Sequence, residues 1–139
     1  ARASGGGGQA SVELVAILAV LQFISFTALT GRARGQSGLK APAVTGHEGF
    51  ERMYRVQMNT LELLIAFLPA LLLAARYWSP EFVAGLGVIY LVGRFAYWRA
   101  YVQAPAKRGL GFVLSMVPTF TLAVLALIGV VMSIAGIEG

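Results

Sequence analysis

The sequence predicts an all-α protein that is embedded in a membrane as a bundle of four helices. Of its 139 residues, 58% are hydrophobic and only 12% are charged, which is typical of integral membrane proteins rather than of soluble domains. Four long and largely apolar stretches are separated by short polar or proline-containing segments. Each stretch is long enough to cross a hydrocarbon core of about 30 Å as a helix. The length of the chain suits a single domain.

The first helix is expected over residues 12–30, which form a nearly unbroken apolar run. Ser11 is suited to cap this helix, because a serine hydroxyl can accept a hydrogen bond from the first turn. Residues 1–10 contain a run of glycines and predict a flexible tail. The membrane domain is therefore expected to occupy residues 11–139, with a glycine-rich polar loop at residues 31–49.

The other three helices are expected at residues 50–76, 80–103 and 110–134. Ser79 followed by proline is a favourable start for the third helix, because proline is well tolerated at the first helical position. Pro105 should end that helix, because the residue before a proline is pushed out of the α region. The turn between the second and third helices is very short, so these two helices should be antiparallel neighbours.

The basic residues predict the orientation in the membrane. Cytoplasmic loops of membrane proteins carry an excess of lysine and arginine. Here the basic loop residues lie in the first and third loops: Arg32, Arg34, Lys40, Lys107 and Arg108. Loops one and three are therefore expected in the cytoplasm and both termini outside. The formal net charge of +5 is explained by topology and by contact with membrane lipids, and no nucleic-acid partner is expected.

The second helix opens with a polar stripe. At about 100° per residue, Arg52, Arg55, Asn59 and Glu62 fall on one face. A charge at membrane depth is costly unless it is paired or lines a polar cavity. The stripe is therefore a candidate site. Alternatively, Arg55 and Glu62 pair with each other, or with Arg94 of the third helix, as structural ion pairs.

A second stripe lies on the third helix. Arg94, Tyr97 and Tyr101 are spaced by three and four residues and share one face. In an antiparallel pair of helices, this stripe lies level with the polar start of the second helix. Arg108, in the loop that follows, should lie at the same end. Cations, phenols, an amide and a carboxylate are thus expected to cluster at the cytoplasmic boundary.

Composition excludes several kinds of chemistry. The chain has no cysteine and no aspartate, and its single histidine, His47, lies in a loop. A serine–histidine–aspartate triad, a nucleophilic protein thiol and a thiolate or histidine-rich metal site are therefore excluded. No metal is expected.

The motifs of the second and third helices resemble those of the MAPEG family, the membrane-associated proteins in eicosanoid and glutathione metabolism. The segment FERMYRVQMNTLE, at residues 50–62, resembles the E-R-x-x-R-x-x-x-N-x-x-E pattern of that family. GRFAYWRAYVQAPAKRG, at residues 93–109, resembles its R-x-x-Y-x-x-x-Y segment followed by a basic residue. The two outer helices match in hydropathy and length.

The resemblance implies a homotrimer that binds glutathione between neighbouring protomers at the cytoplasmic end. It implies that Glu62 holds the α-amino group, that Arg55 holds a carboxylate, and that Arg108 stabilises the thiolate. The full set of implied glutathione-binding residues is Arg34, Arg55, Gln57, Asn59, Glu62, Arg94, Tyr97 and Tyr101. A guanidinium group suits the proposed role of Arg108, because a nearby positive charge lowers the pKa of a thiol.

The implied function is a membrane-bound glutathione transferase, with peroxidase activity as a further possibility, that conjugates glutathione to hydrophobic electrophiles arriving from the bilayer. In leukotriene-synthase-like members of the family, a tyrosine and a nearby proline follow the glutamate. Here Leu63 follows Glu62 and the proline is delayed to Pro69, which favours a bacterial-type member.

Two other functions are compatible with four membrane helices. One is a non-catalytic lipid-binding or scaffold protein of the same fold, although such a protein has no need of a carboxylate and arginines in one site. The other is a small multidrug transporter, which would need a carboxylate deep in the first helix. Glu13 lies instead at the start of that helix.

Overall fold

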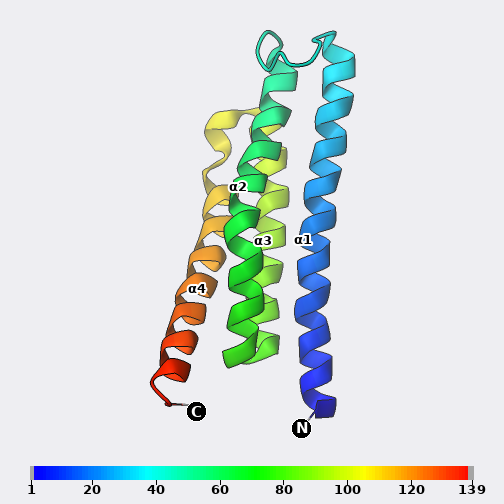
Figure 1. Ribbon diagram of the computed structural model, residues 1–139. Coiled ribbons are helices and arrows are strands. Elements are labelled where there is room, and N and C mark those ends of the chain that lie inside the picture. The colour runs from blue at the N-terminus through cyan, green and yellow to red at the C-terminus, as the bar shows by residue number, and fades with distance from the viewer. Residues whose placement is uncertain (1, 138–139) are drawn as a thin grey trace.

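The computed structural model describes residues 2–137 and consists of helices joined by short connections. The elements are α1 (Arg2–Ser37), α2 (Glu48–Tyr77), α3 (Pro80–Gln103), the 3₁₀ turn η1 (Pro105–Lys107) and α4 (Gly109–Ile134). The four long helices stand side by side (Figure 1). The α1–α2 and α3–α4 connections lie at one end of the bundle, called here the polar end. The α2–α3 turn and both ends of the chain lie at the other (Figure 1). The predicted all-α four-helix bundle is confirmed.

Helix α1 is longer than predicted in both directions. It is helical from Arg2, whereas a flexible tail was expected over residues 1–10; Ala1 lies outside the described residues. Gly8 is buried against Pro80 and Glu81 at the start of α3, where a side chain would not fit. Gly8 thus allows close packing of α1 against α3. At the other end the helix continues to Ser37, because Gly38, with a φ of 79°, is the first residue in the left-handed conformation that ends helices.

The ends of α2 and α3 follow the sequence closely. His47 caps α2, and its Nδ1 accepts a hydrogen bond from the backbone N–H of Phe50 at 3.2 Å. Ser79 caps α3 as predicted, with its hydroxyl accepting from the N–H of Phe82 at 3.3 Å. The predicted bounds of α3, residues 80–103, are confirmed.

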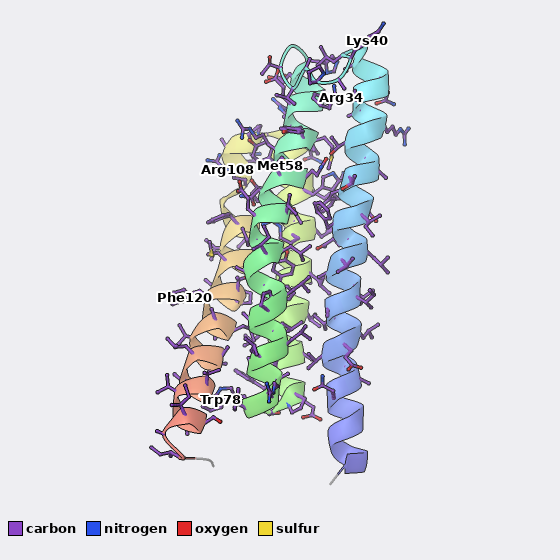
Figure 2. The ribbon with its side chains drawn as sticks, viewed as in Figure 1. Arg34, Lys40, Met58, Trp78, Arg108 and Phe120 are labelled. Carbon is purple, nitrogen blue, oxygen red and sulfur yellow. The ribbon has the colours of Figure 1, made fainter. Side chains whose placement is uncertain are left out.

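The outer surface of the bundle is apolar. Ile65, Phe120 and Leu127 are each more than 60% exposed, and Phe120 points away from the bundle (Figure 2). Within the described residues, α1, α2 and α4 are long and apolar enough to span a membrane. Helix α3 was also expected to be a span. Its 24 residues extend about 36 Å, but it is not among the helices whose most apolar stretch is hydrophobic enough to span a membrane. The chain therefore presents an apolar surface of the kind that faces lipid.

The interior joins α3 closely to its neighbours. The rings of Phe67 and Tyr90 stack with their centroids 3.8 Å apart. Gly87 packs against Val15, and Gly111 at the start of α4 packs against the backbone of Tyr97, where a Cβ atom would clash. These close approaches fix the register of α3 against α1 and α4, and hence the height at which α4 begins.

Candidate functional site

Seven side chains from α2, α3 and the α3–α4 connection surround one cavity at the polar end. Its volume is about 230 Å³. The lining residues are Arg55, Met58, Asn59, Glu62, Tyr97, Tyr101 and Arg108. Figure 2 shows Met58 and Arg108 at the same level of the bundle. Six of these residues were predicted from the sequence as site residues. We call this space the arginine–glutamate cavity.

The α2 side of the cavity is formed by one helical face. Arg55, Asn59 and Glu62 are spaced by four and three residues, and all three line the cavity. Arg55 and Glu62 are exposed, whereas Asn59 is half-buried. Met58, which sequence reasoning missed, lies on the same face three residues after Arg55. Its helical spacing from Arg55 is the signal that indicates this position, although its side chain is apolar.

The charged side chains that line the cavity form no ion pairs with one another in the described part of the chain. Among residues 7–137, the one ion pair within 4.0 Å joins Arg52 to Glu48 at 3.2 Å. Within that part of the chain, Glu62 pairs with neither Arg55 nor Arg94, so the alternative of structural ion pairs is not supported. The carboxylate and both cavity arginines remain available to a ligand.

The tyrosines form the α3 wall. The rings of Tyr97 and Tyr101 lie with their centroids 5.5 Å apart. Tyr97 is buried, and the guanidinium carbon of Arg94 lies 4.3 Å from its ring centroid. Tyr101 is half-buried and also lines a wider opening of about 490 Å³ toward the α1–α2 loop. A ligand in the cavity would therefore meet aromatic surface on one side and charged groups on the other.

Arg94 lies apart from the other predicted site residues of α3. It is fully buried, with 0% of its surface exposed, and does not line the cavity. The guanidinium atom Nη2 of Arg94 donates a hydrogen bond to Oδ1 of Asn59 at 2.7 Å. Arg94 was expected to bind glutathione directly, but in this structure it lies behind Asn59, because the side chain of Asn59 stands between α3 and the cavity.

Arg34 and Gln57 also lie away from the cavity. Arg34 is in the last turn of α1 rather than in the loop. Its Nη1 donates a hydrogen bond to the carbonyl of Ala43 at 2.8 Å. Its guanidinium carbon lies 4.6 Å from the ring centroid of Phe50. Gln57 is two residues, or about 200°, from both Arg55 and Asn59. It shares the face of α2 that carries Phe50. Within one protomer, these two predicted residues are therefore not brought to the cavity.

Arg108 stands between two cavities. Its NH1 donates to the carbonyl of Pro105 at 2.9 Å, within its own turn. The second cavity, of about 430 Å³, is lined by Asn59, Tyr97, Ala106, Arg108, Gly109 and Phe112. Ligand sites usually measure about 300–1,000 Å³. The arginine–glutamate cavity falls below that range alone, but reaches it together with this neighbour, with which it shares Asn59, Tyr97 and Arg108.

A further cavity of about 320 Å³ lies at the opposite end of the bundle. Its lining, as far as the structure describes the chain, contains Arg76 and the aromatic residues Tyr77 and Trp78, but no carboxylate. Trp78 lies there, far from Arg108 (Figure 2), and its indole N–H donates to the carbonyl of Leu125 at 2.8 Å. The combination of arginines, an amide, tyrosines and a carboxylate occurs at the polar end.

Comparison with known proteins agrees with the motifs of α2 and α3. The model of the MAPEG family matches residues 12–128. The chain belongs to the MAPEG family. The matched region contains every residue of the arginine–glutamate cavity.

Three relatives show how this MAPEG protein compares with its family. An uncharacterized protein of Synechocystis sp. is 44% identical over 84% of this chain and 85% of its own length. Microsomal glutathione S-transferase 2 of Mus musculus is 38% identical over 89% of this chain and 84% of its own length. Leukotriene C4 synthase of Cavia porcellus is 33% identical over 71% of this chain and 66% of its own length.

Proposed function

We propose that this MAPEG protein is a membrane-bound transferase that conjugates the thiolate of glutathione to hydrophobic electrophiles. The observation that carries the proposal is the arginine–glutamate cavity. The names of its relatives, microsomal glutathione S-transferase 2 and leukotriene C4 synthase, support a glutathione-related transferase activity.

Charge complementarity supports glutathione as the ligand. The anionic groups of ionised glutathione, two carboxylates and a thiolate, outnumber its single ammonium group. In the same way, the arginines in and behind the cavity, Arg55, Arg94 and Arg108, outnumber its one glutamate. Arg55 is suited to a carboxylate, which a guanidinium group binds through two parallel hydrogen bonds. Glu62 is suited to the ammonium group.

The proposed reaction needs a thiolate, because the thiol form is a poor nucleophile. The protein has no cysteine, so glutathione supplies the sulfur. That sulfur forms a bond to the electrophilic carbon, and the leaving group departs with the bonding electrons. Arg108 would favour the thiolate by its positive charge. The neighbouring cavity lined by Phe112 is suited to hold the apolar electrophile, because it adjoins Arg108 and has an aromatic side chain in its wall.

We further propose that the site is completed in a homotrimer. Arg34 and Gln57 lie on a different side of α2 from Arg55 and Glu62. In a closed ring of head-to-tail contacts, one face of each protomer meets a different face of the next protomer. Such a contact would add Arg34 and Gln57 of one protomer to the cavity of the next. Mass measurement in mild detergent should give a trimer; a stable monomer or dimer would contradict this assembly.

The orientation of the protein remains a proposal as well. We place the polar end, with loops one and three, in the cytoplasm, because these loops carry five of the eleven lysine and arginine residues, whereas the α2–α3 turn carries none. Glutathione would then enter from the cytoplasm. Labelling of a single cysteine introduced at Lys40, from either side of sealed vesicles, tests this placement.

Glutathione binding to the purified protein in detergent tests the proposed function. Calorimetry should show saturable binding, and mixing with a chlorodinitrobenzene should then release chloride as the conjugate forms. A parallel assay with an organic hydroperoxide tests peroxidase activity. Binding without turnover on any electrophile would point to the alternative, a non-catalytic protein of the same fold. Absence of binding would contradict the proposal itself.

A further inference from the structure

Arg94 has surroundings that its sequence position did not predict. Its guanidinium group is fully buried, and among the described residues it has no carboxylate partner. Its Nη2 donates a hydrogen bond to Oδ1 of Asn59 at 2.7 Å, while Nε and Nη1 are buried without an acceptor in the described part of the chain. The group also lies against the ring of Tyr97. A buried cation held in this way depends strongly on the one oxygen that faces it.

The contact fixes the orientation of the Asn59 amide. Arginine has only N–H donors, so the atom of Asn59 that faces it must be the oxygen. A flipped amide would place its NH2 group against the guanidinium group, two donors facing each other, and lose a charge-assisted hydrogen bond. With Oδ1 held by Arg94, the Nδ2 group is left without an acceptor in the described part of the chain. Asn59 lines both cavities at the polar end.

We infer that Arg94 is a positioning residue, which holds Asn59 so that its Nδ2 group donates a hydrogen bond to a peptide carbonyl or carboxylate oxygen of bound glutathione. This inference rests on the proposed function. It assigns Arg94 an action through Asn59 instead of direct contact with the ligand. This role also accounts for the burial of the charged Arg94 side chain, because a neutral donor would hold the Asn59 amide less strongly.

The replacement Asn59→Asp separates the effect of the side chain of residue 59 on ligand binding from its effect on the stability of the fold. One carboxylate oxygen of the aspartate keeps the acceptor that Arg94 needs and forms an ion pair with it, so the fold should be retained. The other oxygen takes the place of the Nδ2 donor. Calorimetry on the purified full chain in detergent should show glutathione affinity reduced at least about tenfold. Unchanged affinity in Asn59→Asp would overturn the inference.

A double-mutant cycle tests whether Arg94 acts through Asn59. Arg94→Gln alone should reduce glutathione affinity about tenfold, and Arg94→Lys should restore part of the loss because it keeps a charged donor. In an Asn59→Ala background, Arg94→Gln should cause no further loss beyond about twofold, because the group that it positions is already gone. Losses that add in full would overturn the inference.

The controls separate the possible failures. Arg99→Gln is the matched control, since Arg99 is an exposed arginine of the same helix that lies over the ring of Trp98, and it should bind glutathione normally. Gel filtration and thermal melting show whether Arg94→Gln folds. If it does not, the glutathione affinity of Asn59→Asp, in which Arg94 is intact, tests the inference. Failure of the unmodified protein to bind glutathione would contradict the proposed function and this inference with it. Normal binding with additive losses would contradict the inference alone.

Discussion

Replacing Arg108 by alanine should raise the pKa of the glutathione thiol in the bound state. Arg108 lines both cavities at the polar end, and NH1 is its one bonded guanidinium nitrogen among the described residues, donating to the carbonyl of Pro105. The rest of the guanidinium group is free to act on a bound anion. Because arginine stays protonated at any relevant pH, its charge favours the thiolate over the thiol.

The size of the effect follows from the exposure of Arg108. Two unit charges about 4 Å apart interact by about 1 kcal/mol in water and about 4 kcal/mol at an effective dielectric constant of 20. Arg108 is exposed, so we use a value near the lower end, about 1.4 kcal/mol, or about one pKa unit. The thiol of free cysteine has a pKa of about 8.5. A bound thiol at about 7.5 would be about one quarter ionised at pH 7, against about 3% without Arg108. Turnover should therefore fall about eightfold at pH 7 and recover as the pH rises.

The ultraviolet absorbance of the thiolate, followed against pH in the glutathione-loaded protein, measures this shift directly. The rate of conjugation should show the same displacement to higher pH. Arg108→Lys is the matched control, because it keeps the charge and should keep most of the shift. If Arg108→Ala leaves both pH profiles unchanged, Arg108 does not act on the thiol and the catalytic assignment fails.

Three further changes test the other parts of the site. Glu62→Gln should weaken glutathione binding by about 1.5 kcal/mol or more through loss of a charged partner, whereas Arg99→Lys should not; equal affinities would remove Glu62 from the site. Phe112→Ala should raise the KM for an apolar electrophile about fivefold, from loss of about 1 kcal/mol of apolar contact, and leave the KM for glutathione unchanged; a change in the glutathione KM alone would contradict this assignment. Gly111→Ala should lower stability by about 1–3 kcal/mol, because its Cβ atom would clash with the backbone of Tyr97. Thermal melting in detergent measures the loss, and Gly109→Ala, with open space around it, is the control; equal melting temperatures would refute the packing argument.

Helical spacing predicted the α2 side of the cavity well. Arg55, Asn59 and Glu62 were expected on one face, and the structure places them around one cavity. This succeeded because residues three and four apart share a face in any straight helix. Their role in glutathione binding remains a prediction.

Helical spacing does not predict positions that depend on contacts between helices. Arg94 shares a stripe with Tyr97, but the packing of α3 against α2 places it behind Asn59 rather than in the cavity. The glycines at the start of α1 predict a flexible tail, whereas in the structure Gly8 allows that segment to pack against α3. Gln57 and Arg34 were implied as ligand-binding residues by the family resemblance, yet one protomer does not bring them to the cavity. Such positions are set by tertiary or quaternary packing, which a single helical pattern does not contain.

Arg108 is held in place by contacts that do not involve a ligand. Arg52 donates from Nη1 to the carbonyls of Val102 and Gln103, both at 3.1 Å. It thus fastens the end of α3 to α2, immediately before η1. Gly111 then brings the start of α4 against Tyr97 from the other side. With the chain fixed on both sides of Arg108, the proposed role of its charge requires little further ordering of this segment when a ligand binds.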